Sequence, residues 1–182
     1  MIARRFSGVS LQFVLAATSL ILAMSGHAFA QAASSKDTVL KAANITAKIF
    51  PDAVFYRGHV APVQIRNTGG VHFADGFYFL AGLVDNSGYS TGIKQKYQGY
   101  LITEVSVEIN GQALKPGAYG IGFMDSEKLI VTDLDANNLL EIVGQVDNDL
   151  KHPTPLQVLA DLETGGYRLY LGRDYVPMKR AS

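Results

Sequence analysis

The chain has 182 residues, which is enough for one domain, and its 16 basic and 16 acidic side chains balance. It contains no cysteine, which excludes a disulfide framework, a thiolate nucleophile and cysteine-ligated zinc or iron–sulfur sites. The balance of charge lacks the broad basic field of a nucleic-acid-binding protein. With 48% apolar and 18% charged residues, the composition is typical of a folded domain.

Residues 1–30 have the pattern of a secretory signal peptide. Two arginines near the start precede an apolar stretch from Leu11 to Met24, and the small residues Ala28 and Ala30 fit a cleavage site. The apolar stretch is shorter than the roughly 20 residues of a membrane-spanning helix, although an uncleaved anchor is an alternative. We therefore expect cleavage near Ala30, a bacterial periplasmic or secreted location, no membrane span after cleavage, and a single β-rich domain over residues 31–182.

The segment from Asp37 to Phe50 is the one convincing helix in the sequence pattern. Asp37 is a plausible N-cap, and Pro51 would end the helix. The apolar residues at helical spacing are Val39, Leu40, Ala43, Ala47 and Phe50. We expect this stripe to pack on the rest of the domain.

From Val54 onward the sequence alternates between short Val-, Ile-, Tyr- and Phe-rich runs and turn signals. One hairpin is predicted where an alternating run over 104–109 meets Asn110-Gly111, a pair that tolerates the positive φ angles of a type I′ turn. A second is predicted from the runs 156–162 and 167–171, separated by Thr164-Gly165-Gly166. The predicted fold is mainly β: an antiparallel β-sandwich or flattened barrel with one N-terminal helix packed on it.

The run from Phe77 to Val84 is apolar on both faces, so it needs cover on both sides. The sheet core supplies one cover, and the N-terminal helix is the simplest second cover; a second subunit or an apolar ligand are the alternatives. We expect Leu80 and Val84 to face the helix, with Gly82 allowing a close approach. Phe77, Phe79 and Leu83 should then face the sheet core.

No motif in the sequence predicts catalysis, a metal or a cofactor. His59, His72 and His152 lack zinc-binding spacings, and His59 and His72 would need the fold to bring them to Asp75. The run 133–138 begins like a calcium-binding loop but lacks its glycine and its glutamate, which favours a turn. The sequence also has no G-x-S-x-G motif and no phosphate-binding glycine loop, and Glu104 and Glu108 are expected on a solvated strand face.

A set of arginines and tyrosines is the most suggestive feature for binding, because both side chains combine a flat contact surface with a polar tip. The candidate ligand-binding residues are Arg66, Tyr89, Tyr97, Arg168, Tyr170 and Arg173. The opposing interpretation is that tyrosines are common in strands and that arginines solvate sheet edges.

The segment Gly111–Tyr119 reads G-x-x-L-x-x-G-x-Y and is followed by an alternating run. In this respect the chain resembles exported bacterial β-sandwich domains of unknown function, over about twenty residues. The resemblance implies location and fold, and it transfers no catalytic residue.

Together these features favour an exported, non-enzymatic binding or interaction module for an unknown small molecule or protein. A small secreted hydrolase or isomerase with a site assembled from loops is one alternative. A barrel that carries a lipophilic ligand is another. The sequence leaves the oligomeric state open.

Overall fold

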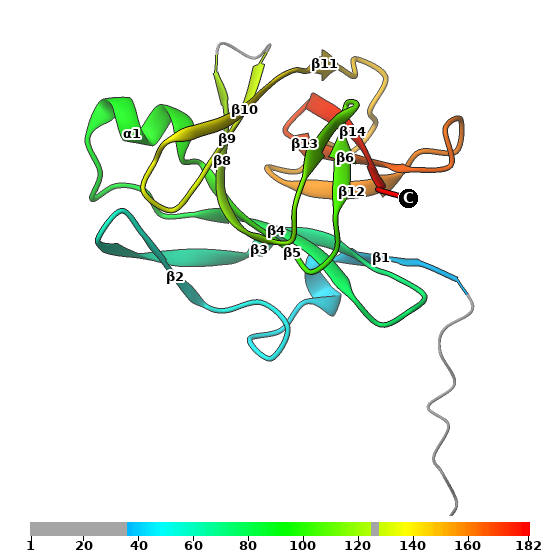
Figure 1. Ribbon diagram of the computed structural model, residues 1–182, viewed down its shortest axis with the longest axis horizontal. Coiled ribbons are helices and arrows are strands. Elements are labelled where there is room, and N and C mark those ends of the chain that lie inside the picture. Colours follow the sequence, from blue (N-terminus) through cyan, green and yellow to red (C-terminus); the bar gives the residue numbers. More distant parts are fainter. Residues whose placement is uncertain (1–35, 125–127) are drawn as a thin grey trace, which may run out of the picture. The chain divides into compact units, whose positions relative to one another are not determined.

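The computed structural model describes residues 36–124 and 128–182. They form two antiparallel sheets that share an apolar core, as an open sandwich and not as a closed barrel (Figure 1). The prediction of a mainly β, antiparallel sandwich is therefore confirmed. The predicted signal peptide, residues 1–30, lies outside the described residues.

The first sheet has eight strands, all paired antiparallel. Seven of them follow the order β1 (Thr38–Lys41), β3 (His59–His72), β4 (Tyr78–Val84), β5 (Gly99–Thr103), β8 (Gly117–Met124), β9 (Lys128–Thr132) and β10 (Asn138–Val143). The eighth, β2 (Ala53–Tyr56), pairs with the first part of β3, whereas β1 pairs with its last part. Strands β1 and β10 are thus the two edges of this sheet.

The second sheet has six strands. Five follow the order β12 (Gln157–Ala160), β13 (Tyr167–Leu171), β14 (Asp174–Arg180), β6 (Val107–Ile109) and β7 (Gln112–Leu114), and β11 (Gln145–Val146) pairs with β14. Both predicted hairpins are confirmed. β6 and β7 join through Asn110 and Gly111, with φ angles of 45° and 81°, and β12 pairs with β13.

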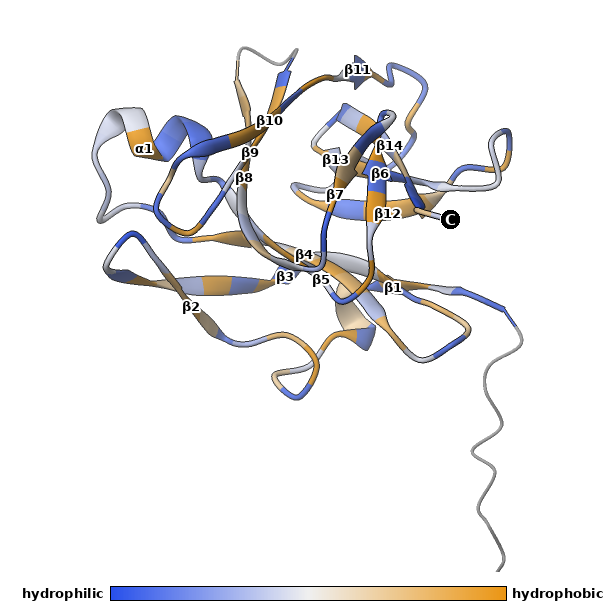
Figure 2. Ribbon diagram, viewed as in Figure 1, coloured by the Kyte–Doolittle hydropathy of each residue, from blue (hydrophilic) through white to orange (hydrophobic). Residues whose placement is uncertain are grey.

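The main core lies between the two sheets. Fully buried side chains come from the first sheet, for example Phe79 and Leu101, and from the second, for example Leu169 and Val176. Figure 2 shows the apolar residues concentrated in the strands, with hydrophilic residues on the connections and on the short helix α1 (Thr91–Lys96). Burial of this apolar surface is the main term that holds the sandwich together.

A second apolar layer covers the other face of the first sheet. Leu80 and Val84 belong to this layer, whereas Phe79 belongs to the main core, as the alternation along β4 predicts. Leu83 packs on the main core as expected. Phe77 does not: it precedes the strand and is 47% exposed, so its predicted burial is wrong.

The predicted helix over Asp37–Phe50 is wrong. Residues 38–41 form β1, and only Ala42–Asn44 form a 3-10 turn, before a loop that leads to β2. β1 pairs with Gly69–His72 of β3, so tertiary hydrogen bonding has overridden a local helical pattern.

The loop supplies the cover expected of the helix. Phe50 is fully buried, and its ring lies 3.3 Å from where a Cβ on Gly82 would stand. The predicted close approach at Gly82 is therefore present, although a loop side chain and not a helix makes it.

Helix α1 was not expected from the sequence. It follows Ser90 and packs on β8 and β9. Over residues 36–124 and 128–182 no helix has both the length and the hydrophobicity needed to cross a membrane.

Candidate ligand-binding cleft

A cleft of about 520 Å³ lies where β1, the edge of the first sheet, meets β12, the edge of the second. This volume falls within the range of about 300–1,000 Å³ that small-molecule sites occupy. Seven of its fifteen lining residues are apolar: Leu40, Ala42, Ala43, Leu150, Leu156, Val158 and Leu159. The remaining side chains of the lining are polar or cationic, and none is acidic.

The backbones of the two sheets touch in the lining of the cleft. A Cβ on Gly69 of β3 would stand 2.8 Å from the backbone nitrogen of Val158 and 3.3 Å from the carbonyl carbon of Gln157. Only glycine permits this approach without moving β12. Leu156 and Val158, each 2% exposed, anchor β12 in the main core. This part of the cleft is therefore formed by fixed strand backbone.

An irregularity in β3 accompanies the cleft. Between its pairings with β4 at Val63 and Thr68, β3 advances five residues while β4 advances two. The hydroxyl of Thr68, itself 2% exposed, donates a 2.7 Å hydrogen bond to the Ile65 carbonyl and closes this bulge. Bulges commonly re-aim side chains beside binding sites. Here the extra residues include Arg66, which lines the cleft.

The lining carries an excess of positive charge, and its basic side chains are all exposed to solvent. Its basic side chains are Lys41, Arg66, Lys151 and His152, from three separate segments of the chain. Within residues 36–124 and 128–182, none of the four pairs with a carboxylate. By contrast, several basic residues elsewhere do pair with acids, namely Lys128, Arg168, Lys179 and Arg180.

The six predicted binding residues do not form one surface. Arg66 lines the cleft, and the others lie elsewhere. Arg173 is exposed, and its guanidinium donates 3.0 Å hydrogen bonds to the carbonyls of Asp147 and Asn148. The role of the six residues in binding stays a prediction.

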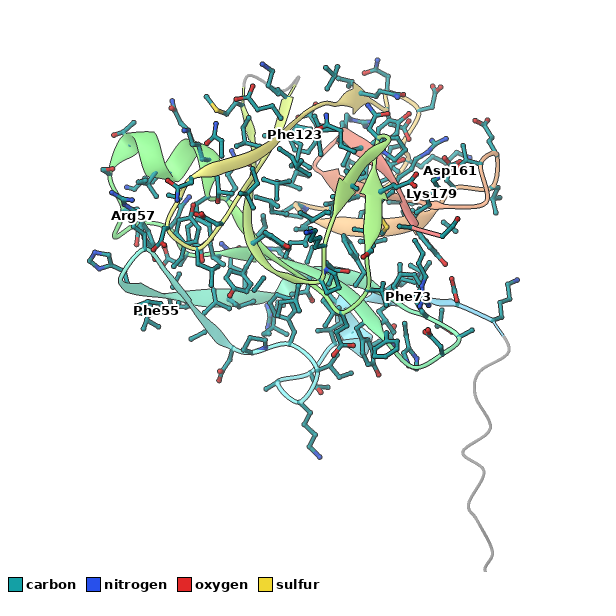
Figure 3. The ribbon with its side chains drawn as sticks, viewed as in Figure 1. Phe55, Arg57, Phe73, Phe123, Asp161 and Lys179 are labelled. Carbon is teal, nitrogen blue, oxygen red and sulfur yellow. The ribbon has the colours of Figure 1, made fainter. Side chains whose placement is uncertain are left out.

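Arg168 belongs to an ion-pair network at the β12–β13 hairpin, where Figure 3 labels Asp161. Its guanidinium lies 3.1 Å from the Asp161 carboxylate, which is almost fully buried, and packs over the ring of Tyr175 at 4.9 Å. Burial alone would raise the pKa of Asp161, but hydrogen bonds from Thr164 and Arg168 outweigh it and lower the pKa. These contacts hold the hairpin.

Tyr170 lies next to this network. It is 2% exposed, and its hydroxyl donates a 2.9 Å hydrogen bond to Asp147. Burial raises its pKa. Like Arg168, Tyr170 has partners within the protein.

Tyr89 and Tyr97 lie in the second apolar layer. Tyr97 is fully buried and stacks on Tyr56 with the ring centroids 3.7 Å apart. Burial, with neighbouring tyrosines, strongly raises the pKa of Tyr97. The hydroxyl of Tyr89 donates to the Tyr56 carbonyl at 2.9 Å. This cluster packs the layer that covers β4 and β5.

The histidines do not converge. His59 contacts Tyr89 edge-on, His72 stacks on Tyr78, and Asp75 pairs with Arg180 at 2.7 Å. In the described part of the chain no three histidine, aspartate or glutamate side chains gather closely enough to hold a metal ion.

The calcium-like run is a turn, as its sequence favours. One carboxylate oxygen of Asp133 accepts 2.9 Å hydrogen bonds from the backbone nitrogens of Asp135 and Asn137.

Glu104 and Glu108 each have a partner within the protein. The Glu104 carboxylate accepts from the Tyr78 backbone nitrogen at 2.8 Å, and Glu108 pairs with Lys179 at 2.9 Å.

Sequence reasoning found only Arg66 among the charged residues of the cleft as a candidate for binding. Lys41 was assigned to a helix, and His152 was considered only as a metal ligand. No local motif joins these positions, because the contact between β1 and β12 creates the site. Comparison of the chain with protein-family models, with curated proteins and with solved structures finds no match.

Proposed function

We propose that the protein is a non-enzymatic binding module whose ligand is a small, largely apolar molecule held in the cleft between β1 and β12. The observation that carries this proposal is the cleft itself: apolar walls, a volume of about 520 Å³ and a part of its lining fixed by the contact of Gly69 with β12. A concave, mostly apolar site on rigid strands is the usual form of a small-molecule site.

The carriage of a lipophilic ligand is the form of this function that the lining favours. Seven of the lining residues are apolar, so an alkyl or aromatic group would bury its surface, and theirs, away from water. In the sandwich such a ligand lies at the junction of two sheet edges and not inside a barrel.

The proposal includes export of the protein from the cytoplasm. The pattern of residues 1–30 supports a signal peptide, and a binding module outside the cytoplasm would meet its ligand there. N-terminal sequencing of the protein from a periplasmic fraction tests this step. A product that retains Met1 would contradict it.

Binding is tested with the neutral fluorophore N-phenyl-1-naphthylamine, whose emission rises in apolar surroundings. We expect saturable enhancement at one equivalent. Ala43→Trp fills the cleft from an exposed position and should abolish the enhancement. Ala113→Trp, at an exposed position of β7 outside the cleft, is the matched control and should bind normally. No saturable signal, or equal binding by both variants, would refute the proposal.

A further inference from the structure

The charge of the cleft is at odds with the composition of the chain. The whole sequence has 16 Lys and Arg residues against 16 Asp and Glu residues, yet the lining contains three Lys or Arg residues, one histidine and no acid. These side chains are exposed to solvent, and within the described ranges no carboxylate pairs with them. A cleft with this excess of positive charge attracts anions.

The cationic and apolar parts of the lining are adjacent in the chain. Lys41 lies between Leu40 and Ala42, and Lys151 and His152 follow Leu150. Both kinds of residue line the same cleft, so a ligand held there meets apolar surface and positive charge together. Arg66, on the bulge of β3, adds a planar guanidinium that can hold an oxyanion through two parallel hydrogen bonds.

From this juxtaposition we infer that the ligand is a single-chain amphiphilic anion: one alkyl chain on the apolar walls, with a terminal oxyanion, such as a carboxylate, held by Arg66, Lys41 and Lys151. This inference rests on the proposed function and names the ligand class of the same cleft. A neutral lipophile would leave the cations uncompensated, and an alkyl cation would be repelled. The charge complementarity therefore selects the anion.

Calorimetry with three ten-carbon probes tests the inference: decanoate, decanol and decyltrimethylammonium. We expect decanoate to bind at least about fivefold more tightly than decanol, because one exposed ion pair contributes up to about fivefold in affinity and the oxyanion meets three cations. The alkyl cation should bind most weakly. Raising the salt from 0.05 M to 0.5 M should weaken decanoate binding and leave decanol binding unchanged.

Arg66→Gln should remove about fivefold of the affinity for decanoate without affecting decanol. Because Arg66 pairs with no carboxylate in the described residues, this substitution leaves no acidic side chain without its partner. Lys115→Gln, at an exposed position outside the cleft, is the matched control and should bind both probes normally.

The outcomes separate the inference from the proposed function. Equal affinities for decanoate and decanol would overturn the anionic ligand and leave the binding function standing. Binding of neither probe would overturn both. Association with phosphatidylglycerol vesicles without binding of free decanoate would show that the surface recognises a bilayer, and would also overturn the inference.

Discussion

Phe50 tests the claim that the loop after β1 is a structural layer of the domain. Its side chain is fully buried against the outer face of the first sheet, and its ring packs on Gly82, where no side chain stands. Phe50→Ala removes the ring and leaves a cavity that the backbone of β4 cannot fill. Buried Phe→Ala substitutions cost about 3–5 kcal/mol, which is a large share of the roughly 5–15 kcal/mol that stabilise a typical domain.

Urea denaturation measures this cost. With a slope of about 2 kcal/mol per molar, the midpoint should fall by about 2 M. Phe55→Ala is the matched control, because Phe55 lies five residues away on β2 and is 58% exposed (Figure 3). It should cost less than about 1 kcal/mol. Equal shifts for the two variants would show that Phe50 does not cover the sheet, and would refute the second apolar layer.

The remaining predictions concern hydroxyl groups, a buried carboxylate and the contact between the sheets. Tyr97→Phe should raise the free energy of unfolding by about 1 kcal/mol, because in the described residues this buried hydroxyl has no hydrogen-bond partner. Tyr56→Phe should lower it by about 1 kcal/mol, since it loses a 2.7 Å bond to Thr132, and equal effects in urea melts would contradict both statements. Asp161 has a lowered pKa in the folded protein, so its contribution is complete above its unfolded pKa of about 3.9 and is lost as the pH falls through the folded value. The stability gap between wild type and Asp161→Asn should therefore close at low pH, and a gap that stays constant from pH 7 to pH 2.5 would oppose this. Gly69→Ala places a methyl group against the backbone of β12 and should cost about 1–3 kcal/mol, and a neutral melting curve would show that the sheets do not touch there.

Local patterns in the sequence predicted the two hairpins β6–β7 and β12–β13, because alternation and turn residues are properties of neighbouring positions. Asn110 and Gly111 both adopt the positive φ angles expected of them. The two faces of β4 were also separated correctly at Phe79 and Leu80.

The helix prediction for residues 37–50 is wrong for a physical reason. The apolar spacing of this segment suits a helix. However, the backbone groups of β3 from Gly69 to His72 need hydrogen-bond partners, and β1 pairs with them. The spacing of apolar residues within a segment does not indicate whether that segment pairs with a strand that is distant in the sequence. The same limit applies to the cleft, whose basic residues come from β1, β3 and the loop before β12.

The arginines and tyrosines singled out for binding show why residue type alone does not define a site. Arg168 and Tyr170 are held by Asp161 and Asp147, and Tyr97 is closed within the second apolar layer. Arg66 differs because it lines the cleft and pairs with no acid in the described residues. Concavity and missing counter-charge, which only the fold shows, mark the candidate site.

The most direct test of the account is an amide-resolved NMR titration of the ¹⁵N-labelled protein with decanoate. The account predicts saturable shift changes at the amides of Leu40, Gly69 and Val158, which surround the cleft, with none along Asn138–Val143 at the opposite edge of the first sheet. Shift changes confined to the exposed hairpin around Phe55, or no saturable change at the cleft amides, would contradict the central claim that this cleft is the binding site.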